Sequence, residues 1–247
     1  MATISDPSSD DIAGEVSIRS LFESFRDSLD QHYDRRERIV KASRDITALS
    51  KKLIGLAHRV TQKPLKSILQ EANEKKDEIS QLFKEISLEL QGINYYRYHK
   101  NISPSIQEFI EAISFLEYLQ NDRLITKEEV ENEFKDETGT QFLLITDEDY
   151  VLGLADLTGE LMRYAINSVG KGDHDRAIKV CQFLRDMKTV HPKSPLGRKV
   201  DTIRQSLSKV EDACYAITIR GSEYPKEFYQ HIVSEHARSY EYVEEEE

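Results

Sequence analysis

Apolar residues recur every three or four positions along most of this chain, and that spacing predicts long amphipathic helices. The first such stretch covers residues 16–61 and would be about 70 Å long at 1.5 Å per residue. Pro64 follows it, and proline ends a helix because it lacks a backbone N–H. A helix of this length needs partner helices along much of its apolar face. The pattern therefore favours a helical bundle.

The same spacing predicts a second helix over residues 67–98 and a third over residues 103–120. Ser103 and Pro104 are interpreted as the N-cap and first residue of the third helix. Serine is a good N-cap, and proline is tolerated at the first helical position. We therefore expect the chain to begin a new helix at Pro104.

Capping signals and glycines divide the rest of the chain into further helices. Thr126 and Glu129 form a capping box that opens a short helix, and the polar residues 131–146 predict a surface loop after it. Asp147 is the expected N-cap of the next helix. The remaining helices are expected over residues 147–170, 173–190, 196–219 and from Pro225 onward.

No stretch shows the strict alternation of apolar and polar residues that a half-buried strand would have. The sequence therefore predicts an all-α protein, an elongated antiparallel bundle of about seven helices. We expect a single domain over residues 15–238. The polar residues 1–14 and the acidic residues 239–247 are expected to be disordered tails.

Composition agrees with this architecture and narrows the class of protein. Glycine (10) and proline (6) are scarce among 247 residues, and 38% of the chain is hydrophobic, enough for one substantial core. We expect no secretory leader and no membrane span, because no apolar run is long enough. Cys181 and Cys214 lack metal-site spacing and are interpreted as thiols of a reducing compartment. An intracellular, soluble protein is therefore expected.

The net charge of −11 argues against a general nucleic-acid coat, because phosphate binding needs cations. A local exception is Y-Y-R-Y-H-K at residues 95–100, where aromatic rings alternate with basic groups. Such a mixture suits single-stranded nucleic acid, so Arg97, His99 and Lys100 are candidate binding residues. The alternative is that the tyrosines fill the bundle while Arg97 and Lys100 extend outward from it.

Four carboxylates lie in two strongly apolar helical stretches. Glu108 and Glu111 are three residues apart, and the second pair, Asp156 and Glu160, is four apart. Both spacings place a pair on one helix face. A buried carboxylate loses several kcal/mol of hydration, and two of them about 4 Å apart repel by roughly 4 kcal/mol at an effective dielectric near 20. If the helices face each other, Mg²⁺ or Mn²⁺ would offset these costs. The ordinary alternative is that each pair lies on a solvated face.

Longer segments of the chain closely resemble the translin family, in its translin-associated factor X branch. The resemblance covers about residues 20–225. It is carried by R-R-E-R-I-V-K-A-S-R-D-I-T (35–47), V-L-G-L-A-D-L-T-G-E-L-M-R (151–163), I-N-S-V-G-K-G-D (166–173) and L-S-K-V-E-D-A-C-Y-A-I-T-I-R-G-S-E (207–223). The Y-Y-R-Y-H-K segment also resembles the basic patch of translin itself.

The resemblance implies an all-α fold and a hetero-oligomer with translin. It further implies a Mg²⁺-dependent endoribonuclease that cleaves single-stranded RNA, such as passenger-strand fragments in RNA silencing and leader fragments from tRNA processing. The family's catalytic carboxylates fall in Q-E-F-I-E-A and A-D-L-T-G-E. In this sequence these positions are Glu108, Glu111, Asp156 and Glu160, which would also hold the metal. Location in cytoplasm and nucleus is implied, although residues 1–14 lack the family's basic targeting cluster.

Two other functions remain open at this point. One is a non-catalytic subunit that stabilises translin and binds RNA through Arg97, His99 and Lys100. The other is an all-α nucleotide pyrophosphatase, which also uses E-x-x-E on a helix. That class pairs the motif with E-x-x-D, whereas this chain has the D-x-x-x-E of Asp156 and Glu160.

Overall fold

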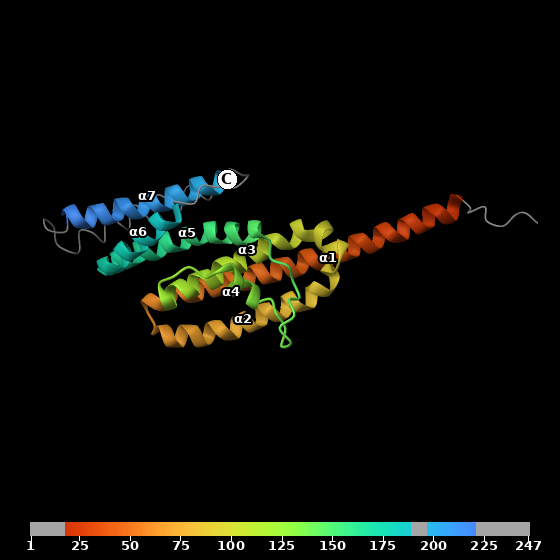
Figure 1. The fold of residues 1–247 in the computed structure, drawn as a ribbon, viewed down its shortest axis with the longest axis horizontal. Helices are drawn as coiled ribbons and strands as arrows, with labels where there is room; N and C mark the ends of the chain where they lie inside the picture. Colours follow the sequence, from red (N-terminus) through yellow and green to blue (C-terminus); the bar gives the residue numbers. More distant parts are fainter. Residues whose placement is uncertain (1–17, 189–196, 221–247) are drawn as a thin grey trace, which may run out of the picture.

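A computed structural model describes residues 18–188 and 197–220, and this part of the chain is almost entirely helical (Figure 1). Its helices are α1 (Ile18–Ala57), α2 (Leu65–Ser87), α3 (Ile93–Asn121), α4 (Lys127–Asn132), α5 (Asp147–Gly170), α6 (His174–Lys188) and α7 (Gly197–Arg220). The 3₁₀ segments η1 (His58–Thr61) and η2 (Leu88–Leu90) follow α1 and α2. The predicted tails 1–14 and 239–247, and the helix predicted from Pro225, lie outside the described residues.

The helices lie side by side as an elongated bundle, which confirms the predicted all-α architecture (Figure 1). α1 packs against both α2 and α3, α3 packs on α5, and α5 packs on α6 and α7. Phe83 of α2, Phe109 of α3 and Phe134 are fully buried and pack as rings with centroids 5.0–5.7 Å apart. None of the described helices is long and apolar enough to cross a membrane.

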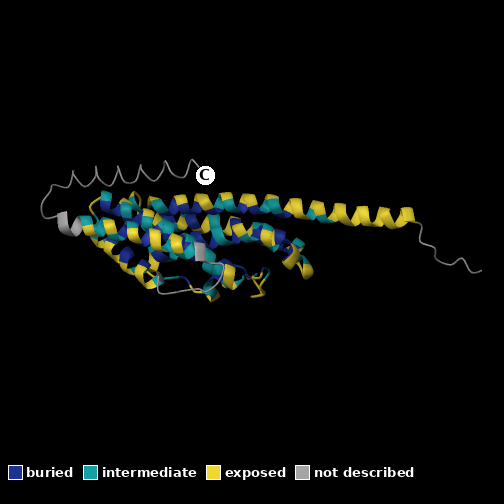
Figure 2. Cartoon of the chain, turned by 90° about the horizontal axis from the view of Figure 1, so that it is seen from above, coloured by how far each residue is buried: buried dark blue, intermediate teal, exposed yellow. Residues whose placement is uncertain are grey.

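The predicted long first helix is confirmed, but only its second half is packed. Burial begins at Ile39, and the preceding half of α1 projects beyond the bundle with most of its surface exposed (Figure 2). The projecting half carries an apolar row at helical spacing, which we call the α1 stripe. Its members are Ile18, Leu21, Phe22, Phe25, Leu29 and Tyr33.

The predicted break at Pro104 is wrong, because Pro104 lies inside α3. The chain breaks instead at Gly92, whose φ of 60° lies in the left-handed region that favours glycine. Pro104 is exposed, so water can reach the carbonyl that loses its helical partner. The residues around it, Ile102 and Ser105, are buried and hold the helix continuous.

Local signals predicted the helix starts after α3 to within one residue. The Thr126–Glu129 capping box is confirmed at the start of α4. The N-cap of α5 is Thr146, not Asp147, and its hydroxyl accepts a hydrogen bond from the Asp149 backbone N–H at 3.0 Å. The predicted surface loop after α4 contributes Phe134 to the core, so it is anchored to the bundle rather than fully solvated.

α5 approaches α3 closely at Gly153. A Cβ built on this glycine would lie 2.8 Å from the Ile110 Cβ and 2.9 Å from the Gln107 carbonyl oxygen, both on α3. Real Cβ atoms do not make such contacts, so only glycine permits this separation of the two helices. The two carboxylate pairs lie on these same two helices.

Candidate functional site

The interface of α3 and α5 brings all four predicted carboxylates into electrostatic range of one another. Glu108 and Glu111 lie on α3, and their partners Asp156 and Glu160 lie on α5. Asp156 and Glu160 each raise the pKa of both α3 glutamates. We call these four residues the carboxylate cluster.

Glu111 is the most buried member of the cluster, with 8% of its surface exposed. Burial is the main reason that its pKa is raised to about 8, and the charges of Glu108, Glu160 and Asp156 raise it further. Burial also raises the pKa of Glu108, against the nearby Lys51. At neutral pH the cluster therefore holds a proton unless a cation takes its place.

Glu160 differs from its neighbours because it has basic partners. Burial alone would raise its pKa, but a hydrogen bond with His58 and the charge of Arg163 outweigh burial, so the pKa is lowered. The His58 Nε2 contacts a Glu160 carboxylate oxygen, and Arg163 Nη1 lies 3.4 Å from the same oxygen. The His58 ring packs on Phe115 with centroids 4.7 Å apart. These contacts fix Glu160 in one place.

Asp156 is paired with Lys199, which comes from α7. Both side chains are about one-third exposed. The ion pair joins α7, the last of the described helices, to the carboxylate cluster, so α7 contributes to the site. Lys199 also lowers the pKa of Glu111, although less than the carboxylates raise it.

The donor chemistry of the cluster fits a hard divalent cation such as Mg²⁺ or Mn²⁺, because all four candidate ligands are carboxylates in a partly desolvated position. Burial first, and then the neighbouring carboxylates, raise the pKa of Glu111, so a cation placed beside it would lower the cost of ionising it. No group of three or more His, Cys, Asp or Glu in the described residues is already arranged to hold a metal. In this structure Asp156 is paired with Lys199 and Glu160 with His58.

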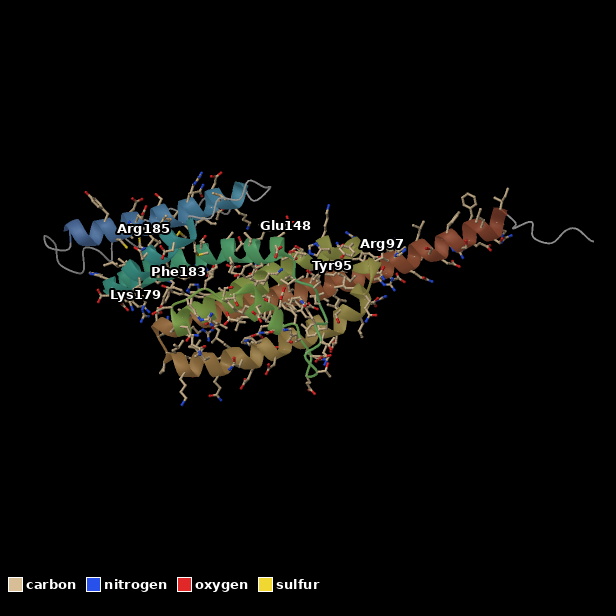
Figure 3. The ribbon with its side chains drawn as sticks, in the orientation of Figure 1. Tyr95, Arg97, Glu148, Lys179, Phe183 and Arg185 are labelled. Carbon is tan, nitrogen blue, oxygen red and sulfur yellow. The ribbon has the colours of Figure 1, made fainter. Side chains whose placement is uncertain are left out.

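The basic, aromatic segment lies at the start of α3, near the point where α1 projects, and Figure 3 shows Tyr95 and Arg97 there. Tyr95 is buried and donates its hydroxyl to the Leu144 carbonyl at 2.8 Å. Tyr96 is 74% exposed, and Arg97 and Lys100 are also exposed. Some tyrosines of this segment therefore fill the bundle while one ring and two cations are exposed, as the alternative interpretation predicted, and RNA binding by the segment stays a prediction.

His99 is committed to a buried acid. Its Nε2 lies 2.8 Å from Asp149 Oδ2, and Asp149 is fully buried on α5. Ser103, Gln107 and Thr146 also donate to this carboxylate. Burial would raise the pKa of Asp149, but the hydrogen bonds outweigh it and the pKa is lowered; the same hydrogen bond raises the pKa of His99. A role for His99 in RNA binding stays a prediction, whereas its contact with Asp149 joins α3 to α5.

The exposed cations and the α3 carboxylates lie in register along the helix. Arg97 and Glu108 are eleven residues apart, and so are Lys100 and Glu111. Eleven residues make about three turns of an α-helix, or roughly 16 Å. Each cation therefore lies on the same helix face as one carboxylate. The helix α3 thus carries both the exposed cations Arg97 and Lys100 and half of the carboxylate cluster.

Sequence reasoning missed His58 and Lys199, the two basic residues that reach the cluster from outside α3 and α5. Neither has a motif, and each meets its partner only through tertiary packing of η1 or α7 against α5. His58 had one available signal, because it directly follows the apolar residues Leu56 and Ala57 at the end of a long helix. Lys199 had none.

These features define the class: an all-α bundle in which two central helices enclose a carboxylate cluster and one of them presents exposed cations. Comparison with known proteins gives the family. The Translin family model matches residues 34–221. The chain belongs to the translin family, as its sequence segments predicted.

Relatives within the family differ in how similar they are to this chain. Translin-associated protein X of Rattus norvegicus is 39% identical, over 91% of this chain and 86% of the relative. The Schizosaccharomyces pombe homologue of that protein is 29% identical over 82% and 89%. Translin of Gallus gallus is 25% identical over 83% and 94%. The similarity therefore favours the branch of translin-associated protein X.

Solved structures share the fold at lower identity. The crystal structure of apo-NeC3PO matches with a TM-score of 0.62 at 22% identity, covering 82% of this chain and 98% of that one. The complex of AfC3PO with duplex RNA matches with a TM-score of 0.59 at 22% identity, covering 83% and 100%. The arrangement of helices described above is thus a known one.

Proposed function

We propose that this chain is the catalytic subunit of a translin-containing, metal-dependent endoribonuclease that cleaves single-stranded RNA. The observation that carries the proposal is the meeting of four carboxylates between α3 and α5, with Glu111 buried and its pKa raised to about 8. Burying Glu111 beside three further acids is costly if their role is only structural. Substrates of the silencing and tRNA-processing kind belong to the same proposal.

The chain's own residues divide the work. Arg97 and Lys100 attract the phosphate backbone of an RNA strand by charge, and exposed Tyr96 offers a ring for base stacking. Along the same helix face the strand reaches Glu108 and Glu111 after about three turns. The solved complex of AfC3PO with duplex RNA supports RNA as the class of ligand.

Glu108, Glu111, Asp156 and Glu160 would hold Mg²⁺ or Mn²⁺. A bound divalent ion supplies Lewis-acid stabilisation of the charge that develops on the scissile phosphate. His58 and Arg163 keep Glu160 ionised and fixed, so this carboxylate is ready as a ligand. Lys199 holds Asp156 in an ion pair, and that pair would have to open or be shared.

Translin is the proposed partner, and we assign the α1 stripe to it. An apolar row on a helix that projects from its own bundle is typical of a surface that another chain covers. Phe22 is 67% exposed and Leu29 is 68% exposed. Exposing apolar side chains of this size to water costs free energy, which burial against another chain would recover. A neighbouring subunit with a matching helix would bury them.

The test is a cleavage assay on single-stranded RNA, with the chain co-purified with translin, in Mg²⁺ and again with chelator. Asp156→Asn and Glu160→Gln should reduce cleavage to the level seen with chelator. Glu148→Gln is the matched control, because Glu148 is exposed on α5 outside the cluster. Full cleavage by either cluster variant, with the assembly intact, would contradict the proposal.

One observation favours a second function, that of a non-catalytic subunit that binds RNA and stabilises translin. Asp156 and Glu160 already have the counter-charges Lys199 and His58, which suits a structural role. In that case the assembly binds RNA equally well with Mg²⁺ or chelator and does not cut it. Membership of the translin family leaves no support for the pyrophosphatase alternative.

A further inference from the structure

A cavity of about 460 Å³ lies between α5, α6 and α7, next to the carboxylate cluster. Its volume falls in the range of roughly 300–1,000 Å³ typical of small-molecule sites. The walls are mostly apolar, with two aromatic rings and two charged side chains. The lining residues are Leu124, Tyr150, Val151, Leu154, Ala155, Phe183, Asp186, Met187, Lys199, Val200 and Ile203.

Both aromatic rings of the cavity are held in position from outside it. The Tyr150 hydroxyl donates to the Ile125 carbonyl at 2.8 Å. Phe183 of α6 packs on Tyr118 of α3, with ring centroids 4.7 Å apart (Figure 3 labels Phe183). Rings that cannot turn freely give a planar ligand a preformed surface for stacking, at little cost in side-chain entropy.

The cavity and the carboxylate cluster share one side chain and adjoin along one helix. Lys199 lines the cavity and also pairs with Asp156. Ala155 lines the cavity, and the next residue in α5 is Asp156. A ligand in the cavity would therefore lie beside a cation that also contacts the proposed reaction site.

We propose that this cavity receives one base of the RNA strand, next to the phosphate that lies at the carboxylate cluster. The inference rests on the proposed function and adds a base-binding site to it. A nucleobase has apolar faces, which match Tyr150 and Phe183, and a polar edge, which matches the charged side chains of the lining, Asp186 and Lys199. The attached phosphate would approach Lys199, whose charge is complementary to it.

The test compares two twelve-nucleotide RNA strands, one of them lacking a single central base. Both carry the same phosphates, so the ratio of their dissociation constants isolates the contribution of the base. Binding of the full chain is measured by fluorescence anisotropy in chelator, where no metal-dependent cleavage interferes. We expect the intact strand to bind about tenfold more tightly, as one stacked base typically provides.

A variant that fills the cavity should remove this preference. Ile203→Trp places a large ring inside it from α7, and Gln205→Trp adds the same ring at an exposed position on α7. We expect the ratio to fall to about one in Ile203→Trp and to stay near the wild-type value in Gln205→Trp. An unchanged ratio in Ile203→Trp would overturn the inference. If Ile203→Trp also lost co-purification with translin, that result would identify a side chain of the partner as the occupant of the cavity.

A photo-crosslinking measurement applies even if Ile203→Trp fails to fold. The wild-type chain is irradiated with a strand that carries 4-thiouridine, and the linked peptides are sequenced. Crosslinks at Tyr150 or Phe183 support the inference, and crosslinks confined to the start of α3 overturn it. Failure of the nuclease proposal would look different, because cleavage would be absent in Mg²⁺ while the base-dependent ratio in chelator persisted.

Discussion

Gly153 of α5 lies against Ile110 of α3 so closely that any larger residue would overlap it: a Cβ there would be 2.8 Å from the Ile110 Cβ. This contact is less than one turn of α5 away from Asp156 and less than one turn of α3 away from both Glu108 and Glu111. The separation of the two carboxylate pairs therefore depends on a glycine that itself does no chemistry.

Gly153→Ala should push α5 away from α3 and destabilise the fold by about 1–3 kcal/mol, less a gain in helix propensity of up to about 1 kcal/mol. Gly159→Ala is the matched control, because Gly159 lies on the same helix with no heavy atom within 4 Å of an added Cβ. It should be neutral or stabilising. Urea denaturation of both variants measures the difference, and equal stabilities would contradict the packing argument.

Stability should fall as pH rises through the neutral range because of Glu111. Its folded pKa of about 8 lies above the ordinary 4.5, so between these values the folded chain keeps a proton that the unfolded chain releases. The contribution of this proton is complete below about pH 4.5 and is lost by about pH 8, at roughly 1 kcal/mol per pH unit. Glu111→Gln should flatten the slope in urea denaturation, while Glu148→Gln keeps it.

Mg²⁺ or Mn²⁺ should raise the melting temperature of the wild-type chain at pH 8, because an ion that binds only the folded state stabilises it. At a hundred times the dissociation constant the gain is about 2.7 kcal/mol. Glu111→Gln should lose most of this response, and Glu148→Gln should retain it. A rise of equal size in Glu111→Gln would show that the ion binds elsewhere.

His99 and Lys100 are neighbours in sequence that should behave oppositely on substitution. His99→Gln removes the imidazole that hydrogen-bonds to the buried Asp149 and should cost about 1–3 kcal/mol of stability. Lys100→Gln should leave the melting temperature unchanged and weaken RNA binding at all sequences, with a smaller salt dependence. Calorimetry and binding at two salt concentrations separate the two, and unaltered RNA affinity in Lys100→Gln would remove it from the interface.

The α1 stripe gives a prediction about assembly. Phe22→Glu with Leu29→Glu should abolish co-purification with translin, yet barely change the melting temperature, because neither side chain packs in its own bundle. Arg36→Glu is the control, an exposed position on the same helix outside the stripe. Size-exclusion chromatography measures the outcome, and an intact assembly in the double variant would assign the stripe to another partner.

Most of the fold was predictable because the periodicity of apolar residues reports helices directly. The error at Pro104 arose because the sequence does not show that this residue faces solvent, where a missing helical hydrogen bond is satisfied by water. Gly92, the real break, was not distinguished from other glycines, since its positive φ is visible only in the structure.

The acids of the candidate site were predictable, but the two bases that reach it from other helices were not. Pairs such as Glu108 and Glu111 share a helix face by spacing alone, so their neighbourhood follows from sequence. His58 and Lys199 reach the cluster across helix contacts that spacing does not encode. The cavity beside Lys199 was likewise hidden, because its walls come from three helices and the segment after α3.

The continuity of α3 through Pro104 has a consequence for the products of the proposed reaction. The proposed RNA-binding residues Arg97 and Lys100 lie on the same continuous helix as the proposed cleavage-site residues Glu108 and Glu111. The distance of roughly 16 Å between binding and cleavage therefore does not depend on the sequence of the RNA. The length of RNA between the bound phosphates and the cleaved bond would then be the same for every substrate. A hinge at Pro104 would have made that length variable.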